Sequence, residues 1–363
     1  MSTALTNFSD QRASNNAMQA AQEPKASRGQ KRPGALVISL DFELHWGVRD
    51  SSPLDGSEQA RLLSARRIVP RMLDLFEEFS IHATWATVGL LFAQSRTEAE
   101  AFMPTCRPKY RDSRLDPYQE TIGAGEADDP FHFAPSLIAE IASRPGQEIA
   151  CHSFSHYYAM EPGQAAEEFE ADLVSAVAMA AQSGHTLRSY VFPRNEVNPE
   201  YLSILKRLGI QAYRGTEPTK IKEARSFDRQ QRPHRRLGRL LDTYLDLCGN
   251  QTCLWPRDGR LISVAASRYL RPYSPVLQPF EVWRHARIEQ AMKNAAERGE
   301  VFHLWWHPED FSHHCDENLG FLRSVLRTFD NYRAQHGMVS VGMAEIHSTQ
   351  PMCTSQQELY ELV

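Results

Sequence analysis

Short apolar segments alternate with segments of helical periodicity along the chain, and several of the apolar segments end in ionisable residues. The apolar segments stand at 34–47, 81–92, 147–156, 187–193, 209–215 and 300–308, and helical patterns occupy 58–79, 135–143, 163–182 and 285–298. Such alternation is typical of α/β folds with a mostly parallel sheet or barrel. We therefore expect an α/β domain over 34–347.

The two ends of the chain and one internal segment differ from this pattern. Residues 1–33 are rich in Ser, Asn, Gln, Ala and Lys, which predicts a disordered tail, and 348–363 form a C-terminal tail. We interpret 216–257 as an insertion or lid. Its part 219–240 forms either a solvated face or a site for an anionic substrate, such as a phosphate-bearing sugar carrier, or for a membrane surface. The basic residues there are Lys220, Lys222, Arg225, Arg229, Arg232, Arg235, Arg236 and Arg239.

Composition excludes several classes of protein. A formal net charge of -5 gives no reason to expect nucleic-acid binding. The N-terminus lacks the apolar run of a signal peptide, and no apolar run is long enough for a transmembrane helix. The six cysteines are scattered and are expected to be mostly free thiols; Cys248 and Cys253 lack the second pair that a zinc ribbon requires. These features predict a cytoplasmic protein, with peripheral membrane contact left open.

The first apolar segment ends in two acids and a histidine. In "ISLDFELHWG" the residues Asp41, Glu43 and His45 alternate with apolar neighbours, so on a strand their side chains share one face. Burying two carboxylates together is costly unless a cation compensates them. A metal ion would do so, and a structural arginine is the alternative.

A second cluster favours the metal ion. In "HSFSH", His152 and His156 are separated by the spacing that lets two imidazoles reach one ion. With one carboxylate they form the two-histidine, one-carboxylate set that leaves positions open for water and substrate. Such an ion activates water and polarises a carbonyl oxygen. We expect one divalent metal, Zn²⁺ first, although Co²⁺, Ni²⁺ and Fe²⁺ suit the same ligands.

Amide hydrolysis also needs a base and an acid, and the ends of other predicted strands supply candidates. Asp41 is the candidate base if Glu43 holds the metal, and His307, at the end of "VFHLWWH", is the candidate acid. Arg194 in "VFPRN" is expected to pair with Asp41 and keep it ionised. His303 shares the face of His307 but lies deeper, as a hydrogen-bonded core histidine does. Active sites of α/β folds gather at the carboxyl ends of strands.

The order of these motifs resembles the polysaccharide deacetylase family, also described by its NodB homology domain and as carbohydrate esterase family 4. The acid pair, "ATW", "HSFSH", the arginine-containing loop and the late-strand histidine carry the resemblance, over about 34–215 and 258–347. It implies a distorted (β/α) barrel that removes acetyl groups from sugars with a zinc-like metal. It assigns Asp41 as base, Glu43, His152 and His156 as metal ligands, and His307 as acid.

Two motifs depart from the commonest family pattern. Asp41-Phe42-Glu43 replaces adjacent aspartates, as in members with an acid-x-acid motif, and "FPRN" around Arg194 replaces Arg-x-Pro-Tyr. The strings "FELHWG" and "WWHPEDF" resemble a subgroup linked with bacterial surface-polysaccharide synthesis.

Further residues have several open roles. His45 is a substitute metal ligand, a partner of Glu43, or a pocket residue that touches the sugar. Trp46 and Trp306 flank the expected site, where an aromatic face suits a sugar ring, or else belong to the core. Glu309 and Asp310 follow His307 closely and are candidates for orienting its imidazole.

Three functions are compatible with this pattern. The leading hypothesis is a metal-dependent N-deacetylase that acts on an acetamido sugar, free or linked to a nucleotide or lipid, as a precursor of a surface polysaccharide. The second keeps the metal and hydrolyses a non-sugar amide or cyclic ureide. The third is a degenerate barrel that binds a glycan or a protein without chemistry.

Overall fold

The computed structural model describes residues 32–216, 233–256 and 259–348. Those from Pro33 onward belong to one structural unit. Most of both predicted terminal tails, and residues 217–232 of the basic segment, lie outside the described residues.

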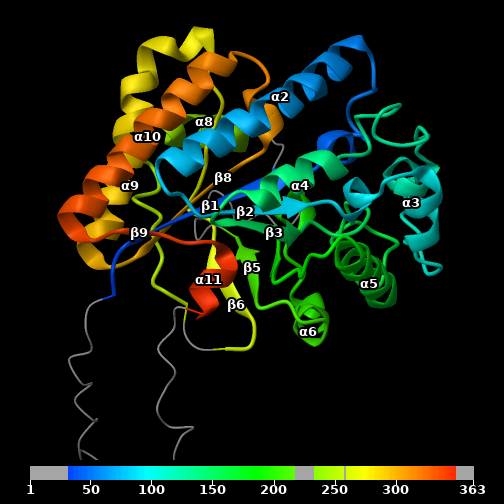
Figure 1. Cartoon of the computed structure of the whole chain (residues 1–363). Coiled ribbons are helices and arrows are strands. Elements are labelled where there is room, and N and C mark those ends of the chain that lie inside the picture. Colours follow the sequence, from blue (N-terminus) through cyan, green and yellow to red (C-terminus); the bar gives the residue numbers. More distant parts are fainter. Residues whose placement is uncertain (1–31, 217–232, 257–258, 349–363) are drawn as a thin grey trace, which may run out of the picture. The chain divides into compact units, whose positions relative to one another are not determined.

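A parallel sheet forms the centre of the unit (Figure 1). Its order is β6-β5-β4-β3-β2-β1-β8-β7, and β9 also pairs with β1. Strands β1 and β8, from opposite ends of the chain, lie side by side in parallel register, with Ala35 opposite Val301. The strands are β1 (Ala35–Phe42), β2 (Ala83–Thr87), β3 (Gln147–Cys151), β4 (Ser189–Tyr190), β5 (Ala212–Gly215), β6 (Ile262–Ala265), β7 (Arg268–Tyr269), β8 (Val301–Trp306) and β9 (Val339–Ser340).

The strands at the two ends of this order, β6 and β7, follow one another in the chain. The short link between them therefore requires the sheet to curl so that its two edges come together. β6 pairs with β5, β7 pairs with β8, and only two residues separate β6 from β7. Across this link Ala266 N–H donates to Gly215 O at 3.0 Å, and Ser267 N–H donates to His303 O at 2.9 Å. The segment thus joins both edges, and the predicted α/β class and distorted (β/α) barrel are confirmed.

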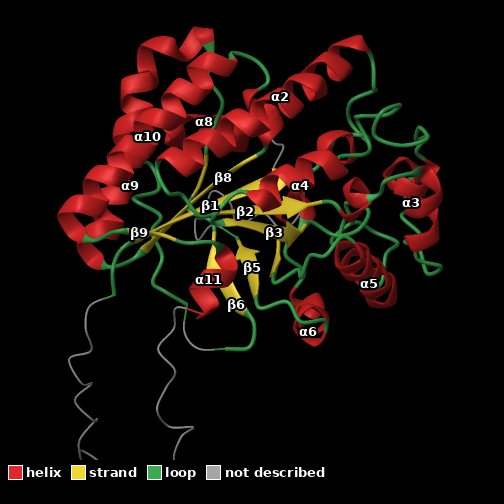
Figure 2. Cartoon of the chain, in the orientation of Figure 1, coloured by secondary structure: helices red, strands yellow, loops and turns green. Residues whose placement is uncertain are grey.

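Helices surround the strands (Figure 2). The predicted helix at 58–79 is α2, which buries an apolar stripe made of Leu62, Ala65, Ile68, Met72 and Phe76. The helices are α2 (Gly56–Glu78), α3 (Arg96–Phe102), α4 (Pro135–Ser143), α5 (Ala166–Gln182), α6 (Leu202–Arg207), α8 (Pro233–Tyr244), α9 (Glu281–Arg298), α10 (Cys315–His336) and α11 (Met343–Ser348).

The side chains of β1 alternate between two cores. Leu36, Ile38 and Leu40 belong to the large cluster that includes the apolar faces of the helices, whereas Ala35 and Val37 belong to a smaller cluster with side chains of β5, β6 and α11. This is the period of two that a strand imposes. Ser39 and Asp41 continue the second set, so β1 directs Asp41 to the side opposite the large cluster.

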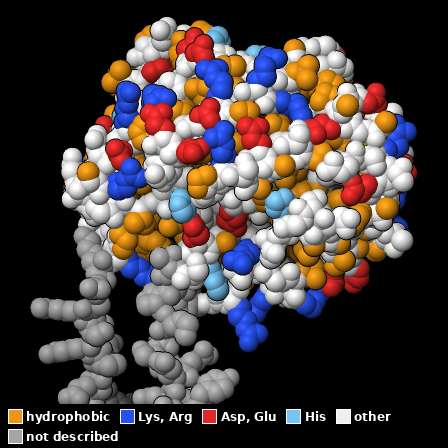
Figure 3. All heavy atoms as spheres, in the orientation of Figure 1, with side chains coloured by type: hydrophobic (Ala, Val, Ile, Leu, Met, Phe, Trp, Pro, Cys, Tyr) orange, Lys and Arg blue, Asp and Glu red, His pale blue; other side chains and the backbone are white. Residues whose placement is uncertain are grey.

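No helix within the described ranges has the length and apolar character needed to cross a membrane. On the face drawn in Figure 3, acidic and basic side chains are intermingled.

Candidate active site

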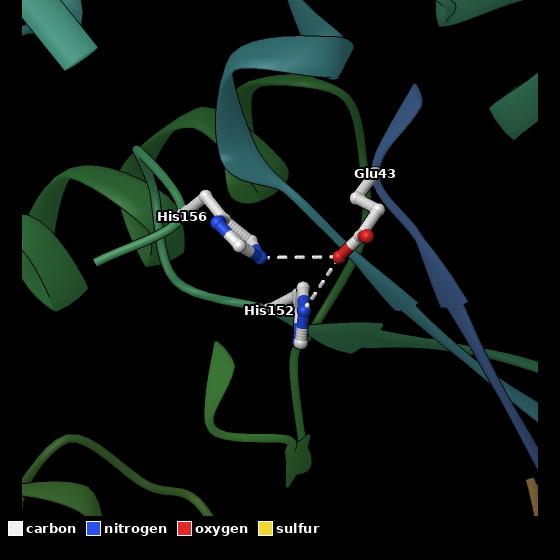
Figure 4. Close-up of side chains that lie close together, drawn as sticks. All are labelled: Glu43, His152 and His156. Carbon is white, nitrogen blue, oxygen red and sulfur yellow. Dashed lines mark hydrogen bonds and ion pairs between the residues drawn. The ribbon is translucent and has the colours of Figure 1, made fainter. Parts of the chain in front are cut away.

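Three predicted ligands converge where β1 and β3 end. Glu43 follows β1 directly, and its Oε2 lies 3.1 Å from Nε2 of His152 and 3.1 Å from Nε2 of His156 (Figure 4). All three side chains are buried, and their donor atoms lie within 4.8 Å of one another. Two imidazole nitrogens directed at one carboxylate oxygen form a compact donor set that fits a divalent metal.

The protonation of this group suits a cation. His152 Nδ1 lies 2.9 Å from Val191 O, so the ring proton is on Nδ1. Nε2 then carries the lone pair that can bind a metal. Burial lowers the pKa of His156 to about 4, so its imidazole is neutral at neutral pH. Burial alone would raise the pKa of Glu43, but neighbouring His307, His156 and His152 hold it well below its usual value.

The turn that carries both histidines is held by one buried carboxylate. Asp172 of α5 accepts hydrogen bonds from Phe154 N–H at 2.7 Å, Ser155 N–H at 3.1 Å and the Ser155 hydroxyl at 2.5 Å. His156 itself has a φ of 59°, a left-handed conformation that is unfavourable without such support. Local sequence gave no sign of this role for Asp172.

Asp41 is paired with Arg214, not with Arg194 as expected. Arg214 of β5 donates from Nη1 to Asp41 Oδ1 at 2.7 Å and from Nη2 to Oδ2 at 2.6 Å, and both side chains are buried. Burial raises the pKa of Asp41, but the neighbouring Arg214 and His152 lower it by more, so the pKa lies below its usual value.

Arg194 lies nearby with other acids. It pairs with Asp50 and with Glu161, the latter at 2.7 Å, and its guanidinium lies over the ring of Tyr158. The expected Arg194–Asp41 pair is therefore wrong. Alternation along "AYRG" was the available signal, because Ala212 and Arg214 share the face of β5 that looks into the barrel.

His307 lies on the other side of the two acids. Its Nε2 is 3.7 Å from Asp41 Oδ2 and 3.6 Å from Glu43 Oε1, and its Nδ1 is 3.1 Å from Asp310 Oδ2. Burial lowers the pKa of His307, but Glu43, Asp310 and Asp41 outweigh it and raise the pKa well above its usual value. Asp310 also accepts the Tyr269 hydroxyl at 2.7 Å, so it lies where the sequence had suggested an orienting acid.

Glu309 and His303 contact the backbone and a serine rather than the reacting groups. Glu309 Oε1 accepts Leu44 N–H at 2.8 Å, and burial together with Glu43 raises the pKa of Glu309 to about 7. His303 is fully buried with Nε2 2.8 Å from Ser39 Oγ, which also accepts from Arg214 at 3.0 Å. His303 thus reaches Asp41 only through a chain of hydrogen bonds.

The expected common face of Asp41, Glu43 and His45 does not extend to His45. β1 ends at Phe42, and a 3-10 turn η1 (Leu44–Gly47) follows, with Leu44 at a φ of 46°. This turn directs His45 to a separate cluster with His132 and Glu120, and His45 does not line the cavity beside the acids. Its predicted roles as a substitute ligand with His152 and His156 or a sugar contact are therefore wrong.

The predicted tryptophans are core residues. Trp46 and Trp306 are 1% and 0% exposed, and Trp306 stacks on Phe311. Trp305, whose side chain faces the barrel as His303 and His307 do, lines the cavity together with Tyr269. Strand alternation could have identified it.

The acids at the end of β1 and His307 border a cavity of about 530 Å³. Asp41, Glu43, His156 and His307 line its wall, as do Arg239 and Arg271. This volume is typical of a small-molecule site.

Comparison with known proteins agrees with this architecture. Residues 55–213 match the polysaccharide deacetylase family. No curated protein matches the chain at a significant level. Among solved structures, a candidate polysaccharide deacetylase from Mycobacterium smegmatis superposes with a TM-score of 0.55 at 14% identity, covering 93% of this chain and 94% of its own. The Puue allantoinase superposes with a TM-score of 0.50 at 12% identity, covering 92% and 96%.

At such identities the two superpositions establish the fold, whereas the family match rests on sequence. The match contains both histidines of the "HSFSH" motif, and the acids of β1 and the late histidine join it in space. The predicted relationship to the polysaccharide deacetylase family is therefore confirmed over residues 55–213.

Proposed function

We propose that the protein is a metal-dependent deacetylase that hydrolyses the N-acetyl group, or a similar acyl group, of an amino sugar. The observation that carries the proposal is the arrangement of Asp41 with Arg214 and of His307 with Asp310 on either side of Glu43. An ionised acid and a protonated imidazole thus face one cavity, as amide hydrolysis requires.

Glu43, His152 and His156 would hold the metal, which when bound activates water and polarises the acyl carbonyl. Asp41 accepts a proton from the attacking water, and Arg214 keeps that carboxylate ionised and oriented. Oxygen adds to the acyl carbon, the C–N bond breaks, and His307 gives its Nε2 proton to the leaving amine. Acetate and a free amino sugar are the products.

The remaining walls of the cavity suit a sugar with an anionic extension. Trp305 and Tyr269 offer aromatic faces, with ring centroids 4.9 Å apart. Arg239 and Arg271 offer cations that suit phosphate, which supports a nucleotide- or lipid-linked precursor of a surface polysaccharide. A cytoplasmic location, as inferred from the sequence, is part of this proposal.

The test is acetate release from a panel of free, nucleotide-linked and lipid-linked acetamido sugars, with and without chelator. We expect chelator-sensitive release, restored by Zn²⁺, and a loss of about 10²–10⁴-fold in turnover for Asp41→Asn. Full turnover by Asp41→Asn would sink the assigned mechanism.

A cyclic ureide belongs in the same panel, since the fold is shared with an allantoinase. Hydrolysis of the ureide with no acetate release from any sugar would transfer the mechanism to the second substrate class.

A further inference from the structure

A second group of side chains that can bind a metal includes His45 of η1, the turn that follows Glu43. His45 in η1, Glu120 after the 3-10 turn Pro117–Gln119, and His132 before α4 bring one donor atom each within 4.8 Å of the others. Glu120 Oε1 is 3.8 Å from His132 Nε2 and 4.0 Å from His45 Nε2. The proposed hydrolytic mechanism uses none of these residues.

His132 is oriented as a metal-binding histidine is. Its Nδ1 lies 2.8 Å from Asp129 Oδ2, which places the proton on Nδ1 and leaves the lone pair on Nε2. Nε2 is buried and has no hydrogen-bond partner in the described part of the chain, and the whole residue is 1% exposed. A buried acceptor without a partner is destabilising, and a bound ion would remove that cost.

The distances fit ligands around an ion better than direct hydrogen bonds. Separations of 3.8 and 4.0 Å are too long for a nitrogen–oxygen hydrogen bond. Donor atoms about 2.0–2.2 Å from a tetrahedral zinc ion lie roughly 3.4 Å apart. Glu120 is 28% exposed and sits in a loop, so a small shift of its side chain closes that gap.

We propose that His45, Glu120 and His132 bind a second divalent metal of the zinc class. The ion would fasten the connection between α3 and α4 to the end of β1. Only Leu44 separates His45 from Glu43, so the site holds the turn from which Glu43 reaches the cavity. This inference is independent of the proposed function, because it concerns a different ion held by different side chains.

The test is a titration of the metal-stripped full-length protein with Zn²⁺ against a coloured competing chelator. Wild type should bind two equivalents. Glu120→Gln and His132→Ala should each bind one, His156→Ala should bind one, and Glu120→Gln combined with His156→Ala should bind none. Glu126→Gln is the matched control, since Glu126 lies in the same connection but pairs with Arg66, and it should bind two.

Circular dichroism establishes that each variant is folded. Glu120→Gln keeps the side-chain volume at a partly exposed position, so it decides the matter even if His132→Ala does not fold. One equivalent in wild type that survives in Glu120→Gln and His132→Ala would overturn the second site. One equivalent that is lost in Glu120→Gln but kept in His156→Ala would support it and count against the first site instead.

Discussion

Two arginines lie near the acidic end of β1, and Arg214 is the one that contacts Asp41. Both of its terminal nitrogens donate to the carboxylate, while Arg194 turns toward Asp50 and Glu161. A buried carboxylate without a cation would be protonated and useless as a base. The proposed role of Asp41 as base therefore depends on a residue twenty positions beyond the arginine of the "FPRN" motif.

Arg214→Lys tests this assignment. Lysine keeps the charge but cannot donate two parallel hydrogen bonds, so the carboxylate loses its fixed orientation. We expect kcat to fall about 10²-fold with KM little changed. Arg194→Lys is the matched control and should keep kcat near wild type. The reverse order of the two effects in steady-state kinetics would return the orienting role to Arg194.

The pH dependence of kcat/KM follows from two opposite pKa shifts. As the proposed base, Asp41 must be deprotonated, and its pKa is lowered, so we expect activity to be lost only as pH falls through that low value. As the proposed acid, His307 must be protonated, and its pKa is raised, so we expect activity to persist above the usual pKa of histidine and to be lost as pH rises further. We expect a broad profile that covers neutral pH.

Asp310→Asn should narrow this profile from the alkaline side. Removing the negative charge beside Nδ1 lowers the pKa of His307, so the alkaline limb moves to lower pH and the acid limb stays. Tyr269→Phe removes a hydrogen bond to Asp310 without changing its charge, and should move the limb less. An unchanged alkaline limb in Asp310→Asn would exclude His307 as the group that titrates there.

At the scale of elements, strands β1 to β5 and β8 could be predicted from the sequence, whereas β6, β7, β9 and the turns could not. The apolar segment that forms β1 and the helical periodicity that forms α2 are local patterns, and both elements were confirmed. The end of β1 was not predicted correctly, because the turn at Leu44 is held by a hydrogen bond from its N–H to Glu309. Glu309 lies 265 residues away in the sequence. Likewise, the pairing of Arg214 with Asp41 arises from the closure of the barrel, which no local window contains.

The turn η1 leads to a prediction at Gly47. A Cβ there would lie 1.9 Å from Glu43 Oε1 and 2.1 Å from its Cδ, so alanine must displace the carboxylate. Because the displaced atoms end a side chain, we expect the fold to survive while Zn²⁺ affinity at Glu43 falls about 10–100-fold, as for other losses of ligand support. Gly56→Ala, with nothing within 4 Å, is the control. Unchanged affinity in Gly47→Ala would show that Glu43 is not a ligand.

At the scale of the whole molecule, the site depends on the ring being closed. Asp41 comes from β1, Arg214 from β5 and His307 from the end of β8, and the link between β6 and β7 joins the last two strands. Each strand alone carries one group. The closed sheet brings the proposed base Asp41 and the proposed acid His307 to one cavity and places Arg214 beside Asp41. The family match over 55–213 contains neither Asp41 nor His307.

Ser267→Ala tests how much this closure stabilises the molecule. Ser267 is fully buried, its Oγ accepts His303 N–H at 3.0 Å, and alanine leaves that buried donor without its partner. We expect the free energy of unfolding to fall by about 1–3 kcal/mol in urea titrations, with an unchanged slope because the same surface is exposed. Ser263→Ala, at an exposed position of β6, should change it by less than about 0.5 kcal/mol. If both substitutions lowered the free energy of unfolding equally, the hydrogen bond of Ser267 would add no particular stability at the link between β6 and β7.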